Sequence, residues 1–128
     1  MRSKFYLSAI GSEDNIRALH DQLKLLGSEV KQLRANPLDP SPQAERWLWC
    51  SPYQTCSSDF PEDELTAYLR ENSHLLATLG KHRAGLKDVG PVIVSQPDHN
   101  GIRGCSVSSE LISLLASVNA SLEIDISV

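Results

Sequence analysis

The cysteines and one histidine are the side chains with which this chain could bind a metal or perform nucleophilic chemistry. Cys50 and Cys56 are the closest pair, with five residues between them, a wider gap than the two to four residues common in zinc motifs. A four-ligand site would therefore need Cys105 or His99, brought in by the fold. The alternative is that the cysteines are reduced thiols packed as small apolar groups, and the lack of a second close-spaced pair favours it. A regulatory disulfide between Cys50 and Cys56 is a third alternative.

Nucleophilic catalysis has weak support from the residues around Cys56. This cysteine lies just before a predicted helix, whose N-terminus could lower the pKa of the thiol. Four acidic residues nearby would raise that pKa again; they are Asp59, Glu62, Asp63 and Glu64. The sequence contains no Gly-x-Ser-x-Gly motif, no Cys-x-x-Cys motif and no glycine-rich phosphate loop. We therefore favour a protein that is not an enzyme and needs no cofactor, with an activity based on the cysteines as the alternative.

The last strand carries two carboxylates, Glu123 and Asp125, on one face. They alternate with apolar residues, which are Leu122, Ile124, Ile126 and Val128. Because successive side chains of a strand point to opposite faces, we expect the apolar face to pack under helices and the carboxylates to lie on the other face. Such a pair could act as a general acid and base, bind a hard cation, bind the basic patch of a partner, or simply be solvated. The edge of an open sheet could also pair with a second copy or with a peptide.

Two tryptophans, Trp47 and Trp49, share one face of a predicted strand. With Tyr6 beside them they could stack RNA bases, as exposed aromatics do on some ferredoxin-like sheets. The aromatics are not interleaved with Lys or Arg at the density that RNA binding requires, and the net charge of −4 opposes contact with phosphates. We therefore predict no nucleic-acid binding and expect at least one of the tryptophans to be in the core.

The composition is that of an ordinary globular domain. The chain has 128 residues, 41% of them hydrophobic and 22% charged, which predicts a single domain over residues 1–128. No apolar run approaches the roughly 20 residues of a membrane helix, and the N-terminal apolar run is too short for an export signal. These features predict a cytoplasmic protein without membrane contact.

Hydrophobic periodicity predicts strands and helices in mixed order. The expected strands are residues 4–11, 28–34, 45–53, 91–96, 102–107 and 121–128, and the expected helices are residues 12–27, 57–80 and 108–120. The Asn100–Gly101 pair predicts a hairpin between the fourth and fifth strands, and residues 81–90 are expected to form a polar connection. This order predicts an α+β fold, a ferredoxin-like-derived, mostly antiparallel sheet with three helices packed on one face.

The first predicted helix is the most strongly patterned element. Ser12 is a suitable N-cap, and Gly27 can adopt the left-handed conformation that ends a helix. The expected buried stripe consists of Ile16, Leu19, Leu23 and Leu26. We expect three prolines to hold residues 35–45 in an extended loop.

The chain resembles a small bacterial family, the domain-of-unknown-function family 4279. The resemblance is carried by the tryptophan strand "RWLWCS" and by the C-terminal segment "GCSVSSELISLLASVNASLEIDISV", with "LLG" at the end of the first helix. The chain lacks the basic-aromatic pattern expected after that helix. The resemblance implies kinship in fold with this family and no particular activity.

Taken together, these patterns predict a non-catalytic protein-interaction domain, of which an immunity-type protein that neutralises a toxin is one form. Its surface would be the sheet face or edge, flanked by the 35–45 loop and the hairpin, and it could also form a homodimer. The predicted surface residues are Glu123, Asp125, Trp47, Trp49, His99 and Asn100. The alternative is a small-molecule-binding or metal-binding protein that uses Cys50, Cys56, His99 or Cys105.

Overall fold

The structure is a computed structural model that describes residues 3–33, 38, 46–95 and 106–126. The strands are β1 (Lys4–Gly11), β2 (Glu29–Gln32), β3 (Trp47–Cys50), β4 (Gln54–Thr55), β5 (Leu86–Ser95) and β6 (Glu123–Ile126). The helices are α1 (Glu13–Leu23), α2 (Pro61–Glu71), α3 (Ser73–His82) and α4 (Ser109–Ser117), with a 3₁₀ turn at Arg83–Gly85.

The sheet confirms the expected α+β class and its ferredoxin-like core. Its strand order is β2-β3-β1-β5-β6, and the short β4 also pairs with β1. The neighbours from β2 to β5 are antiparallel, whereas β6 lies parallel to β5. The first four strands of this order are connected as in two interlocked split βαβ units, and α4 and β6 add a further unit at one edge.

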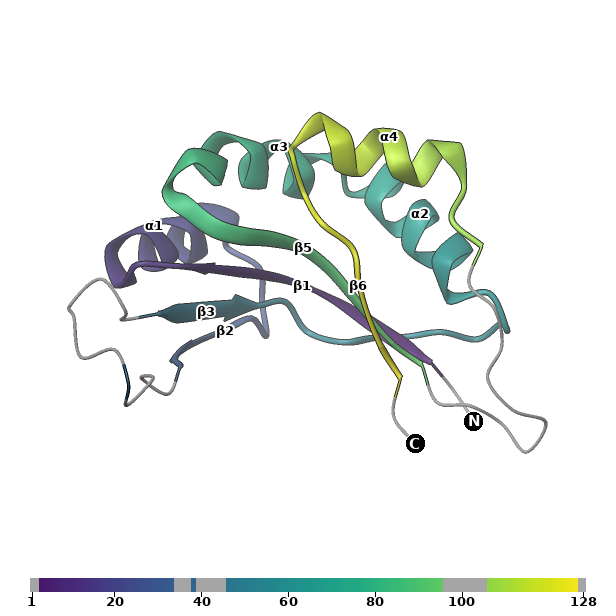
Figure 1. The fold of residues 1–128 in the computed structure, drawn as a ribbon, viewed down its shortest axis with the longest axis horizontal. Coiled ribbons are helices and arrows are strands. Elements are labelled where there is room, and N and C mark those ends of the chain that lie inside the picture. The colour runs from purple at the N-terminus through teal and green to yellow at the C-terminus, as the bar shows by residue number, and fades with distance from the viewer. Residues whose placement is uncertain (1–2, 34–37, 39–45, 96–105, 127–128) are drawn as a thin grey trace.

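Within the described residues, the helices cover one face of the sheet and leave the other face without helices (Figure 1). These residues form four α-helices rather than the expected three, because the predicted helix over residues 57–80 is interrupted at Asn72. The Asn72 side chain and its own backbone N–H both donate to the carbonyl of Tyr68, 2.9 Å away in each case. A short amide side chain that binds the last turn in this way ends a helix, and α3 then starts anew. No helix in the part of the chain that the structure describes is long and apolar enough to cross a membrane.

The first helix ends earlier than Gly27, where the sequence pattern placed its end. Lys24 adopts the left-handed conformation (φ 49°) and its N–H donates to the carbonyl of His20. The expected buried stripe is therefore wrong at Leu26, which is 93% exposed in the turn that follows. Gly27, with φ 85°, serves this turn before β2 instead of the helix end.

Strand β5 begins at Leu86, so half of the expected polar connection is strand and Pro91 lies in its interior. Pro91 is opposite Leu7 of β1, whose N–H and C=O are both bonded to Ser51 on the other side. Leu7 and Pro91 thus form a pair without mutual hydrogen bonds, and the missing proline N–H costs no bond to β1. The expected hairpin at Asn100–Gly101 and most of its return strand lie outside the described residues, and Ser106 and Val107 are not in a strand.

The main core lies between the sheet and the helices. Alternate residues of β1, namely Phe5, Leu7, Ala9 and Gly11, are buried. Their core neighbours from the helices include Ile16, Leu19, Leu65, Leu69, Leu75, Leu79 and Leu111. Burial of such side chains supplies the main stabilisation of the fold, about 1.5–3 kcal/mol for each large one.

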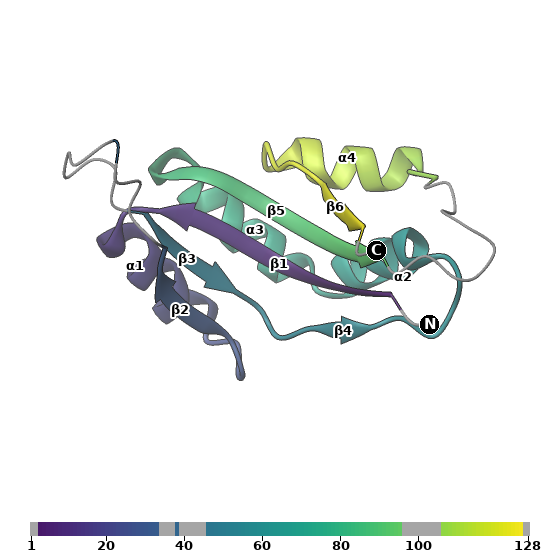
Figure 2. The same cartoon turned by 60° about the horizontal axis from the view of Figure 1, so that its bottom comes forward.

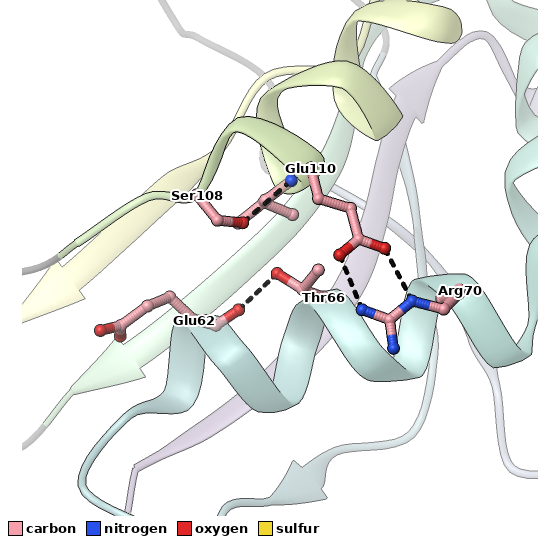
Figure 3. Close-up of polar contacts among 6 residues, drawn as sticks. Glu62, Thr66, Arg70, Ser108 and Glu110 are labelled. Atoms are coloured by element: carbon pink, nitrogen blue, oxygen red, sulfur yellow. Dashed lines mark hydrogen bonds and ion pairs between the residues drawn. The ribbon is translucent and has the colours of Figure 1, made fainter.

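Helix α4 is fixed to α2 and thereby positions β6, which follows it. The Arg70 guanidinium donates two hydrogen bonds of 2.7 Å to the Glu110 carboxylate, as Figure 3 shows. Ser108 caps the first turn of α4 by accepting a hydrogen bond from the N–H of Leu111 at 3.1 Å. Beyond α4 the chain runs beside β5, where the N–H of Ser121 donates to the carbonyl of Val89 at 3.0 Å. These contacts place β6 at the edge of the sheet.

Candidate functional site

The surface of the sheet opposite the helices, here called the open face, is turned toward the viewer in Figure 2. Residues opposite each other in the strand register point to the same face of a sheet. The strand register places the following side chains on the open face, in order from β2 to β6: Glu29 and Lys31 of β2; Leu48 and Cys50 of β3; Lys4, Tyr6, Ser8 and Ile10 of β1; Asp88, Val92 and Val94 of β5; and Glu123 and Asp125 of β6. Its two halves differ, because β2 has charges of both signs whereas β6 has only carboxylates.

Two tyrosines stand near the centre of the open face. The rings of Tyr6 and Tyr53 meet edge to face with their centroids 4.9 Å apart, and the Lys4 ammonium lies 4.2 Å from the centre of the Tyr53 ring. Tyr53 reaches this position because residues 51–53 oppose only Tyr6 and Leu7 of β1, which makes a bulge between β3 and β4. Exposed at 56%, Tyr53 is available for contact with a partner.

The carboxylates of β6 lie within electrostatic range of this tyrosine pair. Glu123 is in register with Val92, which is itself in register with Tyr6. Burial raises the pKa of the Tyr6 hydroxyl, and Cys50, Tyr53, Glu123 and Asp125 raise it further. Tyr6, Glu123 and Asp125 therefore belong to one surface.

Glu123 and Asp125 are exposed and form no hydrogen bond or ion pair with any part of the chain that the structure describes. Asp88, on the same face, is engaged instead, because its Oδ1 accepts hydrogen bonds from Ser121 Oγ at 2.9 Å and from the N–H of Val89 at 3.0 Å. The two carboxylates of β6 thus have no direct ion-pair or hydrogen-bond partner in the described chain.

The apolar side of β6 is packed less than the sequence predicted. Leu122 packs against the core, but Ile124 and Ile126 are 40% and 41% exposed, and Val128 lies outside the described residues. The expectation that this whole face packs under helices is therefore wrong for Ile124 and Ile126. The reason is that β6 is the edge strand and runs away from the end of α4 (Figure 1).

Trp47 and Trp49 lie on the helix side of the sheet, opposite to the carboxylates. Trp49 is in register with Ala9 and is fully buried; Trp47 is half-buried, with the Arg17 guanidinium 5.0 Å from its ring. Both indole N–H groups are buried without an acceptor among the described residues. A stacking platform that combines these tryptophans with Tyr6 is therefore wrong, because the sheet separates them.

The two described cysteines also lie on opposite faces of the sheet. Cys50 is on the open face and half-buried, Cys56 is 1% exposed in the core, and both are free thiols. The expected alternative of a Cys50–Cys56 disulfide is therefore wrong, and the two thiols cannot bind one metal ion together. No group of three or more metal-binding side chains occurs within the described ranges. His99, Asn100 and Cys105 lie outside these ranges.

We expect the two described thiols to be unreactive in the folded protein. Burial, followed by Glu64 and Glu62, raises the pKa of the Cys56 thiol to about 11, so that roughly one molecule in ten thousand carries the thiolate at pH 7. Burial also raises the pKa of Cys50, an effect that Lys31 opposes and Glu29 reinforces.

In a Cys105→Ser variant, Ellman's reagent at pH 7 should therefore label Cys50 slowly and Cys56 only after unfolding. Because the thiolate fraction grows with pH, labelling of Cys50 should speed up toward pH 9. Guanidinium-unfolded protein, in which both thiols react at once, is the control. Rapid labelling of two thiols in the folded variant at pH 7 would contradict this prediction.

The open-face residues that the sequence patterns did not single out include Lys4, Tyr53 and Asp88. Lys4 and Asp88 alternate correctly with their neighbours, but Asp88 was placed in a connection instead of a strand. Tyr53 reaches the open face because of the bulge between β3 and β4, and Pro52 was the feature of the sequence that could have indicated this bulge.

Comparison of the chain with protein-family models, curated proteins and solved structures gave no match. The resemblance to family 4279 stays a prediction, and functional inference depends on the surface itself.

Proposed function

We propose that this chain is a non-catalytic protein-interaction domain that binds a basic protein partner at the β5–β6 half of its open face. The observation that carries the proposal is the exposure of Glu123 and Asp125 without an ion-pair or hydrogen-bond partner in the described chain. An immunity-type protein, which neutralises a toxin by covering its surface, is one form of such a domain.

The tyrosines beside the carboxylates support the same proposal. Tyrosine is enriched at the centres of protein interfaces because it buries a large ring and still offers a hydroxyl group. Tyr6 and Tyr53 provide such anchors, and the carboxylates next to them favour Lys or Arg on the partner. Tyr53 already holds the Lys4 ammonium over its ring, an interaction that a partner cation could replace.

The alternative of a small-molecule or metal site using cysteines gains no support from the described residues. Its closest pair, Cys50 and Cys56, is divided by the sheet. The remaining candidates, His99 and Cys105, lie outside the described residues and would have to form a site without that pair.

Charge reversal tests the proposal. The complex is recovered from extracts of the protein's own host and identified by native mass spectrometry, and the affinity for the identified partner is then measured. The double variant Glu123→Lys with Asp125→Lys should fold normally and bind this partner at least about tenfold more weakly, because attractive charge pairs become repulsive.

The matched control reverses two exposed acids on the helical side, Asp21→Lys with Glu71→Lys. It changes the net charge by the same amount and should leave the affinity within about twofold. Equal losses in both variants would show only a general effect of net charge, and unchanged binding by the β6 variant would refute this choice of surface.

A further inference from the structure

We infer that the partner contributes a β-strand that pairs with the outer edge of β6 and alternates basic with apolar side chains. This inference deepens the proposed function and relies on it for the charge of the partner. The direction of the β6 backbone and the faces of its side chains carry the rest of the argument.

The backbone groups of Ile124 and Ile126 point away from the sheet. The N–H of Ser121 donates to the carbonyl of Val89 on β5. Because backbone groups alternate in direction along an extended chain, those of Glu123 and Asp125 also point to β5, and those of Ile124 and Ile126 point outward.

The pairing of β5 with β1 gives the same directions for the backbone groups of β6. Leu7 directs its N–H and C=O to Ser51, so its partner Pro91 and the alternate residue Ile93 direct theirs toward β6. In the parallel register Ile93 lies opposite Ile124. In a parallel ladder, a residue bonds to the two residues that flank the one opposite it, so Ile93 bonds to Glu123 and Asp125. The outward N–H and C=O groups of Ile124 and Ile126 are thus open to an added strand, since β6 ends the strand order of the described sheet.

The side chains of β6 define which strand fits. A strand paired with β6 places its own side chains next to Glu123 and Asp125 on the open face and next to Ile124 and Ile126 on the helix side. Lys or Arg at alternate positions would meet the two carboxylates, and apolar residues between them would cover isoleucines that are now about 40% exposed. Both sets of contacts are satisfied together only when basic and apolar residues alternate.

A second copy of this chain fits the same edge poorly. In an antiparallel pair of β6 strands with Ile124 opposite Ile124, Glu123 lies opposite Asp125 of the second copy, and like charges in such pairs are destabilising. The other edge of the sheet, β2, has Glu29 and Lys31 on the open face, so its mixed charges do not select a basic strand. The charge complementarity of β6 therefore favours a partner strand of different sequence.

Peptide binding tests this inference without a known partner. The probe is a capped, dye-labelled peptide of about eight residues that alternates Lys with Val, a typical strand length. Its control has the same composition in blocks of Lys and Val, which keeps the charge but cannot place all Lys on one face. Fluorescence anisotropy should give at least about tenfold tighter binding for the alternating peptide. Equal binding of the two peptides would overturn strand addition.

Two variants separate the backbone contribution from the charge contribution. Ile124→Pro removes an outward N–H that β5 does not use, so the sheet should persist while binding falls at least about tenfold; Ile124→Ala controls for the lost side chain. Glu123→Gln with Asp125→Asn should also weaken binding at least about tenfold. Loss in the charge variant without loss in Ile124→Pro would overturn strand addition and leave the proposed function intact, whereas loss in neither would overturn both.

Two further measurements keep the test decisive. If circular dichroism shows that Ile124→Pro does not fold, the same backbone test is made on the alternating peptide by N-methylating every second residue along one edge, then along the other. Only one of the two N-methylated peptides should lose binding, and equal affinities would overturn the inference. Sedimentation of the wild-type protein should give a monomer; a dimer that the charge-neutral variant strengthens would make a second copy the occupant instead.

Discussion

Replacing Gly90 with alanine is expected to lower the free energy of unfolding by about 3 kcal/mol, because the segment that leads into β6 approaches β5 too closely for a side chain at this position. A Cβ atom on residue 90 would lie 1.8 Å from the carbonyl oxygen of Ser121 and 2.9 Å from its carbonyl carbon. Both are backbone atoms, so the clash can be relieved only by moving the segment that leads into β6. Urea denaturation followed by circular dichroism measures the effect.

A matched alanine substitution shows whether the loss comes from this close approach. In Gly80→Ala the added methyl group would lie 3.0 Å from the Cγ1 atom and 3.6 Å from the Cβ atom of Val118, and the short contact is to a side-chain methyl that can shift. Alanine is also the better helix former at this position in α3, so the stability should change by less than about 1 kcal/mol. Similar stabilities for the two variants would contradict the close approach of Ser121 to Gly90 in β5.

Trp49→Ala is expected to cost about 4 kcal/mol, in the range for large aromatic side chains removed from a core. Trp49 is fully buried on the helix side of β3, in register with Ala9. Its indole N–H has no acceptor among the described residues, so no hydrogen bond adds to this loss. Chemical denaturation monitored by circular dichroism gives the change in stability.

Trp47→Ala provides the comparison within the same strand. Trp47 is only half-buried and is in contact with Arg17, so its replacement should cost about 1–2 kcal/mol. Neither tryptophan lies on the open face, and Trp47→Ala should bind the alternating peptide as the wild-type protein does. A loss of peptide binding in the folded Trp47→Ala variant would show that Trp47 contributes to the binding surface.

Local patterns in the sequence were sufficient to predict the starts of two helices and the strand β1. Ser12 and Ser108 were predicted to start helices, and each accepts the expected hydrogen bond from the backbone N–H three residues later. The alternation in residues 4–11 predicted β1, whose buried and half-exposed residues alternate without a break. The order of these elements was enough to predict the α+β class.

The predicted ends of two helices and the predicted start of one strand were wrong. The break at Asn72 depends on its hydrogen bonds to Tyr68, and the early end of α1 depends on Lys24, neither of which hydrophobic periodicity reveals. Pro91 was read as the first residue of a strand, although its pairing with Leu7 needs no N–H on that side. These differences arise from hydrogen bonds rather than from hydrophobic spacing.

Side chains alternate along any strand, so the order of residues is enough to place Glu123 and Asp125 on one face of their strand and Trp47 and Trp49 on one face of theirs. Which of these faces also carries Tyr6 depends on how the strands pair in the folded protein. Ala9 lies opposite Trp49, and Val92 lies between Tyr6 and Glu123, whereas a register shift of one residue would exchange the faces. The register is set by burial of the apolar sides of β1, β3 and β5 under the helices, and the position of β6 at the edge leaves its carboxylates and isoleucines available to a partner.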